Sequence, residues 1–137
     1  MSRENVDLVR RGLDLLRESY RSGAAADGLL ALCAPDIRVD ATRRVFNPAV
    51  YEGAAGVRRS IGEICDAWED FHESNERIID AGDRVVVIQT IAGRGRISKA
   101  QVEQKGALIF TMQDGFVRLI EVFVDPREAL KAVGLAD

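Results

Sequence analysis

A guanidinium and a carboxylate stand two residues apart at Arg38 and Asp40, where apolar and polar residues alternate. This alternation predicts a short strand over residues 37–41 with both charged side chains on one face. If that face lines an apolar cavity, burial raises the pKa of Asp40, so that it can act as a general acid or base near neutral pH. Arg38 would then hold a substrate carbonyl or carboxylate. In the alternative interpretation, Asp40 pairs with Arg38 or Arg43 at the rim of the sheet. Only the first interpretation makes Asp40 a candidate catalytic residue.

Three further side chains are candidates for contacting a ligand: Trp68, His72 and Thr90. His72 is the single histidine, and a metal site needs several convergent ligands, so neither a metal nor another cofactor is expected. It is either a proton shuttle at the mouth of a pocket or a surface residue. Trp68 is either a core residue or a platform for a ligand. Gln89 and Thr90 face opposite ways along one strand, and we expect Thr90 to be the internal one.

The elements that position these residues follow from the spacing of apolar side chains. Helical spacing predicts helices over residues 3–22, 28–33 and 54–70, whereas alternation predicts strands from residue 71 onward. Residues 42–51, which include Asn47-Pro48, are expected to form an irregular loop. Gly93 and Gly95 predict a bulge or bend in the long strand of residues 84–94.

The C-terminal region is the most regular part of the chain. Two alternating strands meet at Asp114-Gly115, and Asp125-Pro126 predicts the capped start of a last helix. The order of elements predicts one α+β domain, residues 1–137, with mostly antiparallel pairing.

Composition excludes several classes of partner. The chain has 19 Lys and Arg against 22 Asp and Glu, with a pI near 5.3, which gives no basic surface for a nucleic acid or an anionic membrane. No apolar run approaches the roughly 18 residues that span a bilayer. Cys33 and Cys65 are far apart and are expected to be free thiols in a reducing cytoplasm.

Several short segments, spread over the whole chain, point to a known family. They are Glu4-Asn5-Val6, Tyr51-Glu52-Gly53 before Gly56-Val57-Arg58, Asp80-Ala81-Gly82-Asp83-Arg84-Val85, Asp114-Gly115, and Ala129-Leu130 with Gly134-Leu135. With them the chain resembles the SnoaL-like branch of the nuclear transport factor 2-like (cystatin-like α+β cone) superfamily.

The resemblance implies a cone-shaped roll, in which a strongly curved, mostly antiparallel sheet wraps around the N-terminal helices and a short C-terminal helix follows. It also implies a deep apolar pocket for a small apolar or aromatic molecule and a homodimer formed through the sheet. Members include polyketide cyclases, ketosteroid isomerase, limonene epoxide hydrolase and scytalone dehydratase, so the fold leaves the reaction open.

The catalytic patterns of these relatives are mostly missing from this chain. A ketosteroid isomerase-like site would place a tyrosine, a carboxylate base and a protonated Asp where this sequence has Leu16, Asp40-Ala41 and Ala107. We expect Ala107, Val122 and Val124 to form an apolar inner wall, which leaves Arg38 and Asp40 on the opposite wall for any chemistry.

Two hypotheses of function follow. In the first, the protein is a cytoplasmic homodimer whose pocket carries out cofactor-free acid-base chemistry, such as isomerisation, cyclisation or dehydration. In the second, it is a ligand-binding or interaction module without catalysis, because the acids of its relatives are absent. The dimer is expected to form through an outward sheet face that carries Glu121 and Phe123 beside Leu108 and Phe110.

Overall fold

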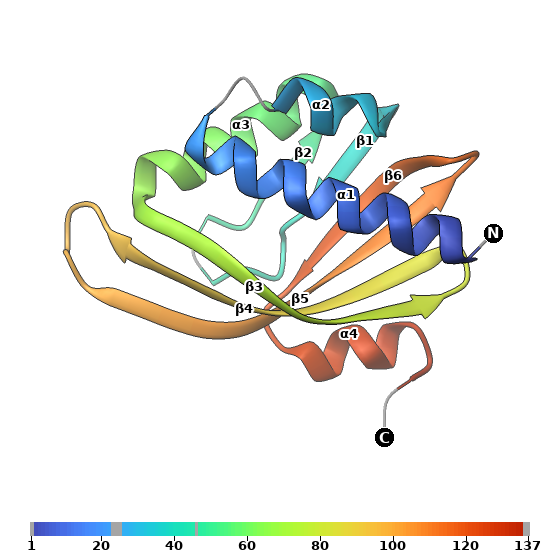
Figure 1. The fold of residues 1–137 in the computed structure, drawn as a ribbon. Coiled ribbons are helices and arrows are strands. Elements are labelled where there is room, and N and C mark those ends of the chain that lie inside the picture. Colours follow the sequence, from blue (N-terminus) through green and yellow to red (C-terminus); the bar gives the residue numbers. More distant parts are fainter. Residues whose placement is uncertain (1, 23–25, 46, 136–137) are drawn as a thin grey trace.

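A computed structural model describes residues 2–22, 26–45 and 47–135 of the chain. In these residues a six-stranded sheet is combined with helices on both of its faces (Figure 1). In chain order the elements are α1 (Ser2–Arg21), α2 (Ala26–Ala31), β1 (Cys33–Asp40), β2 (Val50–Glu52), α3 (Gly53–Ala67), β3 (Trp68–Ala81), β4 (Arg84–Gly95), β5 (Gln101–Gln113), β6 (Phe116–Phe123) and α4 (Pro126–Ala132).

The strands lie in the order β2-β1-β6-β5-β4-β3, and only the β1–β6 pair is parallel. Helices α1, α2 and α3 cover one face of the curved sheet, called the inner face below, and α4 packs on the other, the outer face (Figure 1). The predicted α+β roll with a mostly antiparallel sheet and a short C-terminal helix is therefore confirmed.

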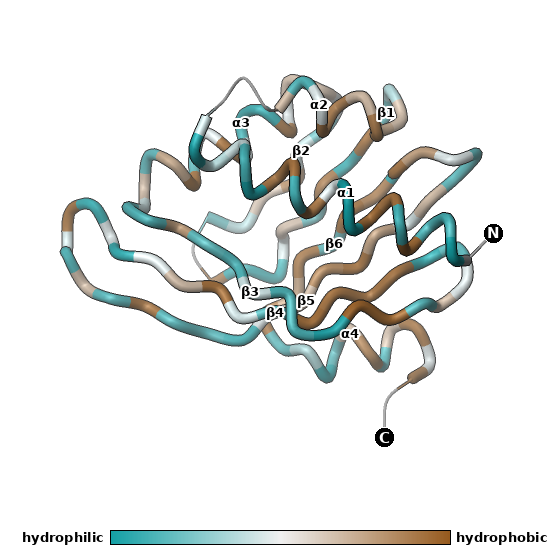
Figure 2. The backbone as a smooth tube through the Cα atoms, in the orientation of Figure 1, coloured by the Kyte–Doolittle hydropathy of each residue, from teal (hydrophilic) through white to brown (hydrophobic). Residues whose placement is uncertain are grey.

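Alternation along the central strands divides the apolar residues between two cores. Val85 and Val87 of β4 pack on the inner face with the helices, whereas Val86 and Ile88 pack on the outer face with Ala129 of α4. A continuous apolar run is typical of a strand that is buried on both faces. Figure 2 shows hydrophobic stretches of the strands gathered where the sheet passes between α1 and α4.

Local signals in the sequence account for the helix and turn boundaries near the C-terminus. The Asp125 carboxylate accepts a hydrogen bond of 2.9 Å from the Arg127 amide and so caps α4, as predicted. Asp114 and Gly115 both have positive φ, 54° and 83°, as the tight turn between β5 and β6 requires. The outer core is also tied to the sheet by Arg84, which donates to the Ala132 carbonyl at 3.2 Å.

Three boundaries differ from the sequence prediction because strand pairing overrides local pattern. Helix α3 ends at Ala67, and Trp68 already begins the edge strand β3, which pairs with β4 along nearly its whole length. A short strand, β2, pairs with β1 inside the expected loop. Pro35 lies within β1, where the ladder to β6 is interrupted between Cys33 and Arg38 and no amide is needed.

The bulge or bend predicted at Gly93 and Gly95 is only partly as expected, because the extra residue lies on β3, opposite Gly93. Strand β4 pairs with β5 without interruption up to Arg94, and the irregularities lie on β3 instead. Gly93 lies close to Phe71 and Trp68 of β3: a Cβ at this position would lie 3.4 Å from both the Phe71 Cα and the Trp68 ring.

Candidate functional site

The structure places Asp40 on the outer face of the sheet. Ile37 and Val39 of β1 are buried against the helices, so Arg38 and Asp40 point the other way. The Asp40 carboxylate accepts hydrogen bonds from the Thr42 amide and hydroxyl at 3.0 and 2.6 Å, and these hold its pKa below the usual value. The expected inward position and raised pKa of Asp40 are therefore wrong.

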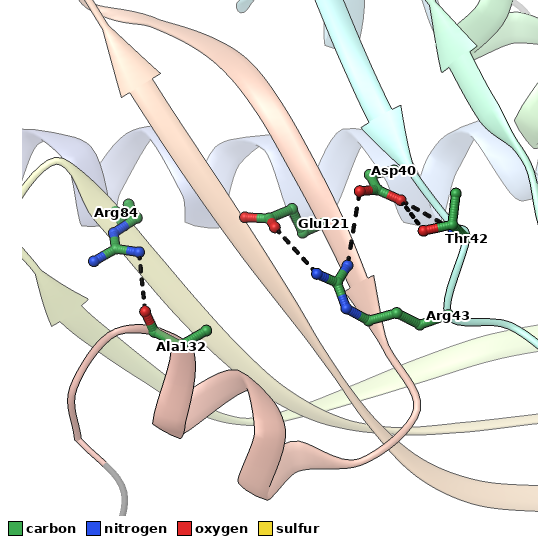
Figure 3. A network of polar contacts seen from close by, with 6 residues as sticks. All are labelled: Asp40, Thr42, Arg43, Arg84, Glu121 and Ala132. Carbon is green, nitrogen blue, oxygen red and sulfur yellow. Dashed lines mark hydrogen bonds and ion pairs between the residues drawn. The ribbon is translucent and has the colours of Figure 1, made fainter.

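Arg43 is the ion-pair partner of Asp40. Its guanidinium lies 3.8 Å from Asp40 and 3.5 Å from Glu121 of β6 (Figure 3). It also lies 4.1 Å over the ring of Phe123. The pairing that the sequence left open as an alternative is thus the one that the structure shows. A catalytic role for Asp40 stays a prediction.

Arg38 lies on the same outer face. It lines an open hollow of about 910 Å³ together with Thr111 and Leu119, which are its neighbours on β5 and β6. Because the helices cover the opposite face of the sheet, this hollow is separate from the interior of the cone.

The wall predicted from β5 and β6 is only partly as expected. Val122 packs against the inner core, but Ala107 packs on the outer face with α4, because the register pairs Leu108 with Val122. Leu108 and Phe110, expected to point outward, therefore face the helices. Val124 lies just beyond the end of β6 and is 41% exposed.

Thr90 and His72 also lie away from the interior. Thr90 donates to Glu76 at 2.9 Å, and exposed His72 places its Nδ1 2.9 Å from the Asp70 carbonyl. The internal residue is Gln89, which is only 3% exposed. The expectation for Thr90 is wrong: Val85 and Val87 point inward, and because side chains alternate along β4, Gln89 points inward and Thr90 outward.

Trp68 belongs to a group of aromatic side chains beside the C-terminal end of α1. The rings of Tyr20 and Phe71 meet edge to face with centroids 4.9 Å apart, and Trp68 lies 6.4 Å from Phe71. The absence of a side chain at Gly93 makes room for the Trp68 ring. These rings form an aromatic wall on the inner side of β3.

A carboxyl group lies next to this wall at Glu73 of β3. Its neighbour Gln89 donates to Asn75 at 3.0 Å. Burial raises the pKa of Glu73 to about 7, although Arg17 and a hydrogen bond from Gln89 act in the opposite direction. A carboxyl group that titrates near 7 can both give and take a proton at physiological pH.

The phenol of Tyr20 interacts electrostatically with two charged groups. Burial raises its pKa well above the usual value, and the charge of Glu73 raises it further, whereas the charge of Arg44 lowers it. Tyr20 therefore remains neutral, and its hydroxyl can donate a hydrogen bond.

Arg44 comes from the loop after β1 and reaches Tyr51 of β2. Its Nη2 lies 3.4 Å from the Tyr51 hydroxyl, which in turn donates to Glu63 of α3 at 2.5 Å. The Nε atom of Arg44 is buried and has no hydrogen-bond partner in the described chain. We call Tyr20, Arg44, Tyr51, Glu73 and Gln89 the inner polar site.

Sequence reasoning missed Glu73 and Arg44. In residues 71–75 every second side chain is polar and the others are mixed, so alternation gave no reason to place Glu73 inward. Arg44 lies in a segment that was expected to be irregular. Only the pairing of β3 with β4 and the contact with Tyr51 bring them inside.

In residues 2–22, 26–45 and 47–135, no three His, Cys, Asp or Glu side chains come together as a metal would require. None of the helices in this part of the chain is long and apolar enough to cross a membrane.

Comparison with known proteins identifies the family. The model of the SnoaL-like domain matches residues 13–120, so the chain belongs to the SnoaL-like domain family. No curated protein matches it.

Solved structures share the fold at low sequence identity. A SnoaL-like protein from Jannaschia sp. CCS1 superposes with a TM-score of 0.78 at 19% identity, over 99% of this chain and 95% of the other. A hypothetical protein with a ketosteroid isomerase-like fold from Catenulispora acidiphila DSM 44928, in complex with trimethylamine, gives 0.72 at 14% identity over 93% and 92%. TerC, co-crystallised with polyporic acid, gives 0.73 at 17% identity over 95% and 98%. The predicted SnoaL-like family is confirmed by the family model, and the predicted fold by these structures.

Proposed function

We propose that the inner polar site binds a small apolar or aromatic molecule and transfers a proton on it without a cofactor, as in an isomerisation, cyclisation or dehydration. The observation that carries this proposal is Glu73, a carboxyl group with a pKa of about 7 on the inner face beside Tyr20. Two proteins of the same fold were crystallised with small molecules, which supports an interior that accepts ligands.

The roles within the site follow from the chemistry of each group. Glu73 moves the proton, since its two protonation states are similarly populated near neutral pH. The phenol of Tyr20 donates a hydrogen bond to the oxygen on which negative charge develops. Phe71 and Trp68 provide the apolar wall against which a flat ligand stacks.

The acid-base role can be tested with a model compound, without the natural substrate. 5-Nitrobenzisoxazole is a small aromatic molecule that loses its ring C–H proton to a base while its N–O bond breaks, with the electron pair leaving on oxygen to form a coloured phenolate. We expect the protein to accelerate this reaction with a rate that rises with pH through about 7. Glu73→Gln should lower kcat/KM by roughly 100-fold or more.

Two variants serve as comparisons. Glu76→Gln changes a carboxylate of the same strand that bonds to Lys105 and Thr90 on the outer face, and should keep the wild-type rate. Asp40→Asn tests the acid favoured by the sequence and should also keep it. A rate that survives Glu73→Gln but falls in Asp40→Asn would refute the assignment.

A second function, ligand binding without catalysis, is favoured by the apolar inner surface of Leu108, Phe110 and Val122, which offers no hydrogen-bond donor. Saturable binding of 5-nitrobenzisoxazole with no acceleration by the wild type would support it over the enzyme.

The proposal also includes a homodimer through the outer sheet face in the cytoplasm. The open hollow lined by Arg38 and Leu119 shows that α4 leaves part of this face uncovered. Cys33 and Cys65 are free thiols, as expected in a reducing compartment. Light scattering should give twice the 15.1 kDa mass of one chain; a mass of one chain at micromolar concentration would exclude the dimer.

A further inference from the structure

Arg44 is a partly buried arginine that forms no ion pair within the described residues. In the described residues its side chain makes one polar contact, of 3.4 Å to the Tyr51 hydroxyl, and its buried Nε has no acceptor. Two other arginines nearby are paired: Arg59 lies 3.6 Å from Glu63, and Arg43 lies between two carboxylates. A buried donor without an acceptor is costly in a folded protein and marks a place where a partner is missing.

The described groups nearest to Arg44 are engaged with other partners. The Tyr51 hydroxyl donates to Glu63 and accepts from the Arg44 Nη2, and the other Glu63 oxygen faces Arg59, so the Arg44 Nε is left without an acceptor. The Arg44 guanidinium lies 5.6 Å over the ring of Tyr51, which is itself fully buried. This contact orients the N–H groups of the guanidinium. A planar guanidinium with a free Nε–H is suited to a planar oxyanion that accepts from two N–H groups at once.

We propose that the inner polar site selects a small aromatic carboxylate, whose carboxylate binds to Arg44 and whose ring packs against Phe71 and Trp68. This inference rests on the proposed function, since it names the substrate class of the same site. Tyr20 connects the two parts of the site: its ring touches Phe71, and the positive charge of Arg44 lowers the pKa of its hydroxyl.

The probes are 2-naphthoate and 2-naphthamide, which have the same ring system and nearly the same shape but differ in charge. Their binding to the wild type and to variants is measured by isothermal titration calorimetry at pH 8. We expect the wild type to bind naphthoate more tightly than naphthamide. Arg44→Gln should weaken naphthoate roughly 10- to 100-fold and change naphthamide by less than about threefold, because it removes a charge-assisted hydrogen bond.

The matched control is Arg59→Gln. Arg59 also lies over the Tyr51 ring, at 4.8 Å, but it is paired with Glu63 and exposed, so its loss should leave naphthoate binding unchanged. Arg44→Lys keeps the charge and removes the fork, and should give an intermediate loss even if Arg44→Gln fails to fold. Equal wild-type affinity for the two probes, or undiminished naphthoate binding in both Arg44 variants, would overturn the inference.

Glu73→Gln separates this inference from the proposed function. It removes a negative charge from the site, so naphthoate should bind more tightly while proton transfer to 5-nitrobenzisoxazole is lost. Selective naphthoate binding without any proton transfer in the wild type would refute the proposed function alone. Proton transfer that depends on Glu73, without preference for naphthoate, would refute the substrate class alone.

Discussion

Replacing Glu73 by glutamine should change how the stability of the protein depends on pH. In the folded protein burial beneath α1 raises the pKa of this carboxyl group from 4.5 to about 7. In the unfolded chain the group is hydrated and returns to its ordinary value. Glutamine has a similar shape and cannot titrate.

The sign and size of the effect follow from proton linkage. Between pH 4.5 and 7 the folded protein holds a proton on Glu73 that the unfolded chain has released. The free energy of unfolding therefore falls as pH rises, by about 1.4 kcal/mol per pH unit. Over the whole window the loss reaches about 3 kcal/mol and then levels off above pH 7.

Urea unfolding at a series of pH values from 4.5 to 8 measures this dependence. The Glu73→Gln variant should lack the fall, so that it gains about 3 kcal/mol on the wild type between the two ends of the window. Glu76→Gln is the control, because hydrogen bonds from Lys105 and Thr90 hold the pKa of Glu76 below its usual value and outside the window. Its curve should run parallel to that of the wild type.

Parallel curves for the wild type and Glu73→Gln would refute the reasoning, since they would mean that Glu73 is ionised in the folded protein. A carboxyl titration followed by carbon NMR gives an independent measurement. A Glu73 signal that titrates near its ordinary pKa would also refute the acid-base role proposed for the site.

Two further predictions concern packing. Gly56→Ala should destabilise the protein by about 1–3 kcal/mol, because a Cβ would lie 2.9 Å from the carbonyl carbon of Tyr51. Gly62→Ala in the same helix meets nothing within 4 Å and should stabilise the protein by up to about 1 kcal/mol. Thermal unfolding of both variants tests this, and equal melting temperatures would contradict the packing argument. Phe110→Ala should lower the free energy of unfolding, measured in urea, by about 3–5 kcal/mol, because the side chain is 2% exposed. Phe116 is 46% exposed, so Phe116→Ala should change it by less than about 0.5 kcal/mol. A small loss for Phe110→Ala would contradict the inward position of Phe110.

Local features of this protein could be predicted from the sequence. The apolar stripe of α1 places Val9 and Leu13 in the core, and the Asp114-Gly115 turn and the Asp125 cap lie where they were expected. Each depends on residues within one turn of helix or one hairpin loop, so the sequence nearby contains all the information that is needed.

The faces of the strands were decided by tertiary structure. Side chains alternate with a period of two, so an error of one position exchanges Gln89 with Thr90 and Ala107 with Leu108. The register of β4 and β5 against their neighbours sets this parity, and no residue within either strand specifies it.

The candidate site was also decided by tertiary structure. The sequence by itself determined the family and the order of elements apart from β2, but it drew attention to Asp40, which lies on the outer face beside Arg43. Glu73 and Arg44 became candidates only because β3 pairs with β4 beneath α1 and a loop folds back onto Tyr51. A shifted pKa and an unpaired cation are consequences of burial, and burial is a property of the folded chain that no single segment carries.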